Sequence, residues 1–109
     1  MQTYETVLEA LADPTRREIV ERLRRAPSAV TDLAAALPVT RPAISQHLKV
    51  LRGVGLVDFD RHGTRNVYRL NPEGLGPLRE WLEAFWQDAL DAFATHVNRT
   101  TTNPGGTNA

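Results

Sequence analysis

The sequence predicts a mainly α-helical domain that contains one small β-hairpin. The first observation is that apolar residues recur at steps of three and four over several segments, which is the period of an amphipathic helix. The second is that Asp13-Pro14, Thr40 and Asn71-Pro72 are of the types that cap or open helices. The third is that residues 56–70 alternate apolar and polar side chains on both sides of Gly63, as a hairpin does.

Two helices are predicted at the N-terminal end. Residues 2–11 carry apolar side chains at helical spacing. Asp13-Pro14 caps a second helix over about residues 14–25, with Ile19 and Leu23 directed inward. The arginines of this second helix are expected to form a solvated face; they are Arg16, Arg17, Arg22, Arg24 and Arg25. The alternative for the first two of them is a contact with a DNA phosphate.

The next two helices are predicted to form a helix-turn-helix. Residues 31–37 are rich in alanine, the best helix former, with Thr31 as the expected N-cap and a proline directly after them. The join to the next helix is only about three residues, the length of a helix-turn-helix corner. The second helix begins after its N-cap Thr40 and ends at one of two glycines, Gly53 or Gly55.

The second helix of the pair has an apolar back and a polar front. Ile44, Leu48 and Leu51 recur at i, i+4 and i+7, so they share one face. Another face carries amide and hydroxyl groups flanked by cations, a mixture that suits base edges with phosphates on either side. The predicted DNA contacts on this helix are Thr40, Arg41, Pro42, Ser45, Gln46, Lys49 and Arg52. The alternative is an ordinary amphipathic helix with a solvated polar face.

A basic β-hairpin is predicted directly after this helix. Residues 56–61 and 65–70 alternate with period two around a turn at residues 62–64. The predicted DNA contacts at its tip are Arg61, His62 and Arg65. A basic hairpin after a helix-turn-helix makes a winged helix, whose wing reaches phosphate or the minor groove. The alternative for the two arginines is solvation of the turn.

The C-terminal part of the chain predicts one long helix and a dimer. Asn71-Pro72 is expected to open the helix, and apolar residues follow at steps of three and four from Leu75 to Val97. So small a core does not need this much apolar surface, and an exposed patch of such a size usually marks an interface. The residues expected at the dimer interface are Val7, Leu11, Leu78, Leu82, Phe85, Trp86, Ala89 and Phe93. The alternative is that the stripe wraps the domain's own core.

Charge is distributed unevenly along the chain. The formal net charge is +0, so the total gives no sign of nucleic-acid binding. Residues 41–69, however, hold six Lys/Arg and two Asp/Glu, so the cations cluster on the helix and hairpin proposed to contact DNA. Residues 98–109 lack apolar side chains apart from the terminal alanine and are expected to be a flexible tail. The folded DNA-binding and dimerisation domain is therefore assigned to residues 1–97.

The composition argues against several classes of protein. Cysteine is absent, so no disulfide and no thiolate metal site can form. There is one lysine, no glycine-rich phosphate loop and no spaced acid–base constellation, so neither an enzyme nor a cofactor is expected. The chain shows no basic N-terminal region and no long apolar run, which favours a cytoplasmic protein without a membrane partner.

Taken together, these segments resemble the ArsR family of bacterial winged-helix repressors over about residues 5–97. The resemblance lies in residues 11–19 (LADPTRREI), 41–51 (RPAISQHLKVL), 55–57 (GLV) and 68–70 (YRL). Each segment alone is weak, whereas the set in this order is quite specific. The resemblance implies a homodimer with four helices, a wing and a final helix. It also implies binding to an imperfect inverted repeat and repression of transcription, often of the protein's own operon.

The family's best-known members sense metals, and this sequence departs from them. Their thiolate motif lies on the helix that corresponds to residues 31–37, which here has no cysteine. A second family site uses Asp and His ligands on the terminal helix, where this chain offers Asp88, Asp91 and His96. Five helical steps rotate His96 by about 140° from Asp91, so the set is poorly phased. The chain is similar to the cysteine-free branch of the family; no metal is expected, and its inducer is unknown.

Two alternatives to a simple repressor stay open. One is a metal- or small-molecule-responsive repressor on the same fold, which an effect of stoichiometric zinc on operator affinity would reveal. The other is a winged helix used only for protein–protein contact, which would need an apolar or acidic front on the second helix of the pair. His47 on that helix is expected to pack or to form a hydrogen bond within the recognition unit, not to bind a ligand.

Overall fold

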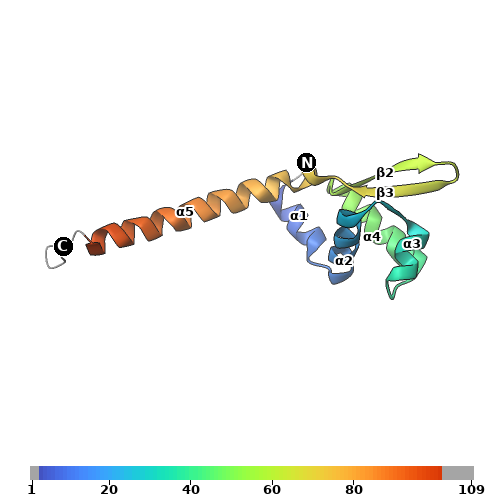
Figure 1. Ribbon diagram of the computed structural model, residues 1–109, viewed down its shortest axis with the longest axis horizontal. Coiled ribbons are helices and arrows are strands. Elements are labelled where there is room, and N and C mark those ends of the chain that lie inside the picture. Colours follow the sequence, from blue (N-terminus) through green and yellow to red (C-terminus); the bar gives the residue numbers. More distant parts are fainter. Residues whose placement is uncertain (1–2, 102–109) are drawn as a thin grey trace. The chain divides into compact units, whose positions relative to one another are not determined.

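Each of the first two helices follows a capping residue, of which the sequence predicted Asp13 but not Thr3. In the computed structural model, which describes residues 3–101 and their side chains through residue 98, α1 spans Tyr4–Leu11 and α2 spans Pro14–Arg25 (Figure 1). The Thr3 hydroxyl accepts a hydrogen bond from the backbone N–H of Thr6, and the Thr6 hydroxyl accepts one from Thr3 in return. Asp13 accepts from the backbone N–H of Arg16 at 3.0 Å, which satisfies one of the free donors at the start of α2.

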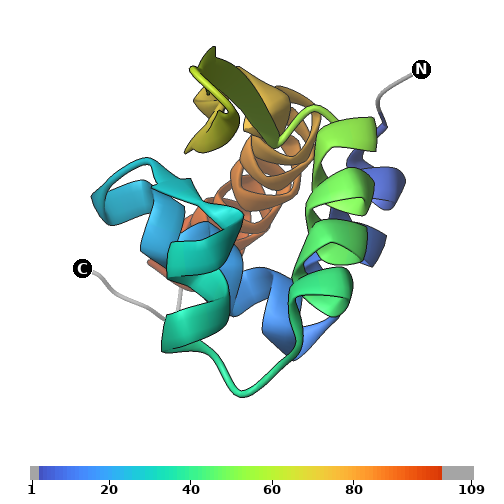
Figure 2. The same ribbon diagram turned by 90° about the vertical axis from the view of Figure 1, so that its right-hand side faces the viewer.

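The helix-turn-helix is formed by α3, Val30–Ala36, and α4, Arg41–Gly53. Figure 2 shows α3 in teal and α4 in green, joined by the segment that forms the turn. Thr40 caps α4 as predicted, its side chain accepting from the backbone N–H of Ala43 at 3.3 Å. The predicted N-cap Thr31 is wrong: the N-cap is Ala29, two residues earlier, and it makes no side-chain cap. The reason is tertiary, since Ala29 belongs to a strand that delivers the chain to the helix.

The hairpin belongs to a three-stranded antiparallel sheet. Its strands are β2, Val57–His62, and β3, Arg65–Leu70, and Gly63 in the turn between them has φ 65°. A third strand, β1, Ser28–Ala29, pairs with the outer side of β3, so the strand order is β1-β3-β2. Strand β1 was not predicted, because two residues carry no periodicity. This strand connects the middle of β3 to the start of α3.

The segment after the hairpin differs from the prediction. Asn71-Pro72 does not open a long helix: Pro72–Leu75 forms a 3-10 turn, η1, and α5 begins at Gly76 and runs to Thr101. The Asn71 side chain makes no cap, and its backbone N–H instead donates to the Leu56 carbonyl at 2.8 Å. Residues 98–101 are therefore helical where a tail was predicted, and residues 102–109 lie outside the described residues.

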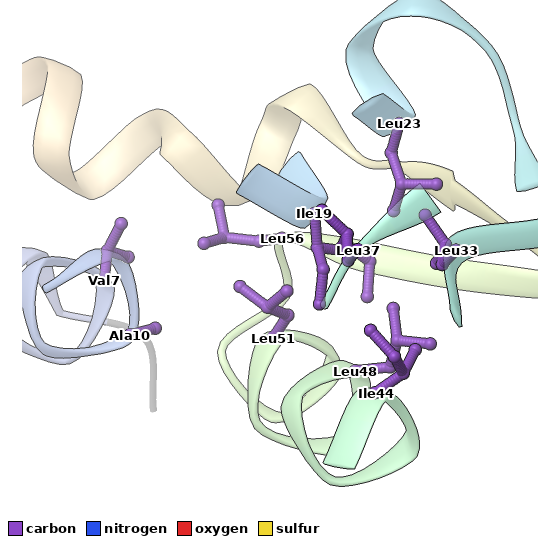
Figure 3. Packing of buried hydrophobic residues seen from close by; sticks show 11 residues of the cluster. Val7, Ala10, Ile19, Leu23, Leu33, Leu37, Ile44, Leu48, Leu51 and Leu56 are labelled. Atoms are coloured by element: carbon purple, nitrogen blue, oxygen red, sulfur yellow. The ribbon is translucent and has the colours of Figure 1, made fainter. Parts of the chain in front are cut away.

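The chain divides at Leu78–Arg79 into two units, and the core belongs to the first. The buried cluster draws on α1, α2, α3, α4 and the start of β2; its members are Val7, Ala10, Ile19, Leu23, Leu33, Leu37, Ile44, Leu48, Leu51, Leu56 and Val57. Figure 3 shows Ile44, Leu48 and Leu51 pointing from α4 toward Ile19 and Leu37. Burial of each large aliphatic side chain is worth about 1.5–3 kcal/mol. The apolar back of α4 is thus fixed to the domain, which leaves its polar front outside.

The second unit holds residues 79–101 of α5, where the large apolar side chains are exposed to solvent. They are Trp81, Leu82, Phe85, Trp86, Leu90 and Phe93. The rings of Trp81 and Phe85 stack with centroids 5.8 Å apart. Despite this apolar content, none of the helices in residues 3–101 combines the length and hydropathy that crossing a bilayer requires.

Candidate nucleic-acid interface

The polar front of α4 is exposed along its whole length. Arg41, Ser45, Lys49 and Arg52 recur along one side of the helix and are all exposed, as is Gln46 beside them. The opposite row, Ile44, Leu48 and Leu51, is 0% exposed. The predicted division of this helix into a buried back and a polar front is confirmed. Thr40 and Pro42, the other predicted contacts, are also exposed, at the N-terminal end of the same helix.

A hollow lies between α4 and the hairpin. Its volume is about 600 Å³, and its lining residues are Ser45, Leu48, Lys49, Arg52, Gly53 and Tyr68. Three of the predicted DNA contacts therefore line the same space as a tyrosine of β3. Tyr68 was predicted to lie in the alternating strand and within the family resemblance, but not beside α4, because nothing in the local sequence shows that β3 faces α4. Tyr68 adds an aromatic ring and a hydroxyl to the polar front.

Arg52 lies against the hairpin. Its guanidinium carbon is 4.4 Å from the centre of the Phe59 ring, and its Nε is 3.6 Å from the Asp58 carboxylate. Phe59 in turn packs against Tyr68 at a centroid distance of 5.3 Å. A cation over an aromatic face contributes about 0.5–1 kcal/mol at an exposed site. Arg52 thus links the C-terminal end of α4 to β2, which the prediction of a DNA contact did not include.

The three predicted contacts at the tip of the hairpin are exposed, and both arginines have protein partners. Arg61 donates from Nε to the Gly63 carbonyl at 3.1 Å. Arg65 forms an ion pair at 3.2 Å with Asp32 of α3, with both side chains more than half exposed. Exposed pairs of this kind contribute only about 0.2–1 kcal/mol, so a phosphate can replace Asp32 at small cost. Arg65 therefore stays available on the α3 side of the hairpin.

Two arginines at the start of α2 bind the end of α1. Arg16 donates to the carbonyls of Ala10 at 2.6 Å and Glu9 at 3.3 Å, and Arg17 donates to those of Leu11 and Ala12 at 2.8 and 3.0 Å. The last carbonyls of a helix lack intrahelical donors, and α1 has no basic residue in its own last turn. The predicted solvated face is therefore wrong for Arg16, which is mostly buried, whereas Arg17 is exposed as predicted; both side chains hold the α1–α2 corner.

Asp13 at this corner has a perturbed pKa. The backbone N–H of Arg16 is the main cause that lowers the pKa of Asp13 from its ordinary value, with smaller contributions from the Thr15 N–H and the charge of Arg16. His47 lies on α4, and its Nδ1 is 3.4 Å from Nη1 of Arg16. His47 thus contacts the protein's own fold as expected, but its partner is on α2 and not within the recognition unit.

The predicted dimer residues separate into two groups. Val7 is 0% exposed and belongs to the core of its own domain, so its place in the predicted interface is wrong. Leu11 and Leu78 are partly buried against the same core. The remaining members of the set are exposed on α5; they are Leu82, Phe85, Trp86, Ala89 and Phe93.

The residues considered as a weak metal site also lie on α5. Within residues 3–101, no three His, Cys, Asp or Glu side chains gather closely enough to hold a metal ion, and this includes Asp88, Asp91 and His96. Asp91 accepts a hydrogen bond from the Gln87 amide at 3.0 Å.

A helix-turn-helix with an exposed polar second helix, followed by a basic hairpin, defines the winged helix-turn-helix class of DNA-binding proteins. The comparisons place the chain within this class. A family model described as "Bacterial regulatory protein, arsR family" matches residues 13–58, from the N-cap of α2 into β2. Together with a relative that is matched over nearly its whole length, this match shows that the chain belongs to the ArsR family of bacterial transcriptional regulators.

Relatives cover most of the chain. The HTH-type transcriptional regulator Rv2034 of Mycobacterium tuberculosis (strain ATCC 25618 / H37Rv) is 54% identical over 101 residues, which is 90% of this chain and 94% of that protein. The HTH-type transcriptional repressor SmtB of Mycobacterium tuberculosis (strain CDC 1551 / Oshkosh) is 45% identical over 64 residues, 59% of this chain, and the match spans 47% of SmtB. Against SmtB, therefore, the similarity extends over about half of the relative's length.

Solved structures share the fold. The solution structure of the homodimeric winged helix-turn-helix DNA-binding domain (fragment 1-100) of Mb0332 from Mycobacterium bovis is 30% identical, with a TM-score of 0.62. The similarity covers 81% of this chain and 82% of that one. The winged helix-turn-helix predicted from the sequence is confirmed by the fold and by this likeness.

Proposed function

We propose that this chain is a transcriptional repressor that binds an inverted-repeat operator as a homodimer and regulates its own operon. The observation that carries the proposal is the exposed front of α4, where Ser45 and Gln46 stand between Arg41 and Lys49. An α-helix fits the major groove, where a glutamine amide can pair with adenine and flanking cations can meet phosphates. The proposed function is DNA binding, and no step of catalysis is part of it.

The two-fold assembly is supported by the exposed stripe on α5 and by the homodimeric state of the Mb0332 domain. A two-fold interface sets the same patch of each protomer against itself. Dimeric helix-turn-helix proteins present their recognition helices about 34–36 Å apart, one turn of DNA, which suits an inverted repeat. The proposed interface consists of Leu11, Leu78, Leu82, Phe85, Trp86, Ala89 and Phe93, with Val7 left out.

Repression is inferred from relatives such as SmtB, whose name describes it as a repressor. A bound dimer that covers a promoter excludes polymerase, so this mode needs no further activity. The protein would then act in the bacterial cytoplasm, where its operator lies. Nothing in residues 3–98 singles out an inducer, and the proposal includes none.

The proposal is tested by footprinting on the protein's own promoter region, followed by titration of the site found with a Gln46→Ala variant. Loss of one bidentate base contact should cost about 1–3 kcal/mol on the operator and leave random-DNA affinity almost unchanged. Gln87→Ala is the matched control, because it removes an exposed glutamine from α5 and not from α4. Equal losses on both DNAs would show that Gln46 reads no base, and the absence of any footprint would contradict autoregulation.

A further inference from the structure

One arginine side chain connects three helices of the first unit. From α2, Arg16 donates through Nε to the Ala10 carbonyl at 2.6 Å and through Nη2 to the Glu9 carbonyl at 3.3 Å, both on α1. Its Nη1 lies 3.9 Å from Asp13, the N-cap of α2, and 3.4 Å from Nδ1 of His47 on α4. The side chain is only 19% exposed. Its guanidinium is therefore held in one place by the end of α1 and can present a fixed donor to α4.

The acceptor of this donor lies beside the polar front of α4. His47 is half-buried and stands between Gln46, which is exposed, and Leu48, which is 0% exposed. A guanidinium can only donate, so Nδ1 of His47 must accept, and the proton of the neutral ring is on Nε2. The contact thus requires one particular tautomer of the imidazole.

Hydrogen bonds and apolar packing hold a helix in different ways. The back of α4 is fixed by Ile44, Leu48 and Leu51, and the attraction between apolar surfaces has no preferred direction. A hydrogen bond does have one, because it weakens steeply when donor and acceptor lose alignment. The bond from Arg16 therefore limits rotation of α4 about its own axis, and such a rotation would move the neighbouring Gln46. Binding groups must be held to within about 0.5 Å to work well.

We infer that Arg16 and His47 form a positioning pair that orients the base-reading face of α4. The inference rests on the proposed function, since it names how the same site is aligned. Neither residue needs to touch DNA. Arg16 is held at the α1–α2 corner, and its hydrogen bond to His47 fixes α4 relative to that corner.

Two substitutions of His47 distinguish a need for its hydrogen-bond acceptor from a need for the imidazole ring. His47→Asn keeps an acceptor, Oδ1, near the place of Nδ1, whereas His47→Leu removes it at similar volume. We expect the Leu variant to lower the operator-to-random affinity ratio about fivefold or more, the worth of one net hydrogen bond. The Asn variant should retain most of the ratio. An unchanged ratio in the Leu variant would overturn the inference, and so would equal losses in both variants, because the latter would mean that the imidazole itself is needed.

Substitution of Arg16 tests the other member of the pair. Arg16→Met should lower the same ratio, and the double variant Arg16→Met/His47→Leu should lose no more than the larger single loss. Arg24→Met is the matched control, because it removes an exposed arginine of the same helix, one that pairs with Glu21 at 3.0 Å and not with α4 in the part of the chain that the structure describes. Fully additive losses would contradict the pair. If Arg16→Met fails to fold, the two His47 variants decide alone.

A spectroscopic measurement detects the Arg16–His47 contact in the absence of DNA. The ¹⁵N shifts of His47 in the wild-type protein at about pH 8 should show an unprotonated Nδ1, and the Arg16→Met variant should shift that resonance. A protonated Nδ1 in the neutral ring would overturn the inference. Failure of the proposed function is a distinct result: the wild type would then show no operator preference for either residue to affect.

Discussion

At the scale of single residues, the arginines show how one side-chain type is assigned by its surroundings. Arg16 and Arg17 bind the carbonyls at the end of α1, Arg52 lies over Phe59, and Arg65 pairs with Asp32. Guanidinium groups thus cap a helix in Arg16 and Arg17, link two elements in Arg52 and form a surface ion pair in Arg65. These partners lie on different elements from the arginines they meet, so local pattern does not identify them. Asp13, by contrast, caps the helix that it immediately precedes.

The Asp13 cap should make folding stability depend on pH. The hydrogen bond from the Arg16 N–H lowers the pKa of Asp13 in the folded state below its unfolded value. Its contribution is therefore complete above the unfolded pKa and is lost as pH falls through the folded pKa. Asp13→Asn keeps a good N-cap but cannot titrate, so we expect a weaker loss of stability on acidification.

Urea unfolding between about pH 7 and pH 3 measures this effect through the free energy of unfolding at each pH. Glu21→Gln is the matched control, since it removes an exposed carboxylate from the same helix without touching the cap. A pH dependence in Asp13→Asn that is identical to that of the wild type would show that the cap carboxylate is not the group responsible.

At the scale of elements, short segments with no periodicity of their own decide how the longer ones join. The turn η1 fits against the end of α4 because Gly74 has no side chain: a Cβ there would overlap the carbonyl of Gly55. Gly55 itself has φ 79°, in the left-handed region that favours glycine. Gly55 and Gly74 therefore let η1 lie directly against the segment that follows α4.

Gly74→Ala should therefore destabilise the domain. Forcing a methyl group into a closed backbone contact shifts the chain and costs about 1–3 kcal/mol. Gly76→Ala is the matched control, since a Cβ at that position meets nothing within 4 Å. It should be neutral or stabilise by up to about 1 kcal/mol, because alanine loses less backbone entropy. Chemical denaturation of the two variants decides the point, and equal stabilities would refute the proposed close contact.

The wing offers a second prediction at this scale. Arg65 is proposed to exchange Asp32 for a phosphate, and each neutralised phosphate adds about 0.9 to the slope of log K against log salt. Arg65→Ala should therefore flatten that slope by about one per protomer. Asp32→Asn, which breaks the same ion pair but keeps the cation, should leave the slope intact. If both variants fold and share the wild-type slope, the wing is not part of the interface.

At the scale of the whole molecule, the apolar stripe of α5 is the feature that one copy of the chain leaves exposed. Phe85, Trp86 and Phe93 are each at least 60% exposed. Their burial in a homodimer would contribute about 1.5–3 kcal/mol per aromatic side chain. A homodimer formed through the stripe would also supply the two recognition helices, at a set spacing, that an inverted repeat needs.

Phe85→Glu should abolish the dimer and leave the fold. The change puts one carboxylate from each protomer into the proposed seam, where unpaired charge is costly. Sedimentation should show monomers that keep their helical content by circular dichroism and bind the operator weakly. Gln87→Glu, which adds a carboxylate to the same helix outside the stripe, should stay dimeric. A wild-type chain that is monomeric at micromolar concentration yet binds the full operator tightly would contradict this assembly.

The sequence by itself determined the elements whose causes are local. Asp13-Pro14 and Thr40 begin α2 and α4 as predicted, since a cap bonds to backbone groups two or three residues away. Period-two alternation around Gly63 located the hairpin, and the spacing of Ile44, Leu48 and Leu51 identified the buried back of α4. The exposed front of that helix, and with it the proposed site, followed from the same spacing.

Only the tertiary structure decided what joins these elements. Strand β1 exists because β3 lies beside it, and Val7 is buried because α1 packs on the core and not on a partner. Tyr68 enters the hollow beside α4, and His47 meets Arg16, thirty-one positions away in sequence. Periodicity and capping act over a few residues, whereas these contacts depend on where distant segments meet, and that is settled by packing of the whole core.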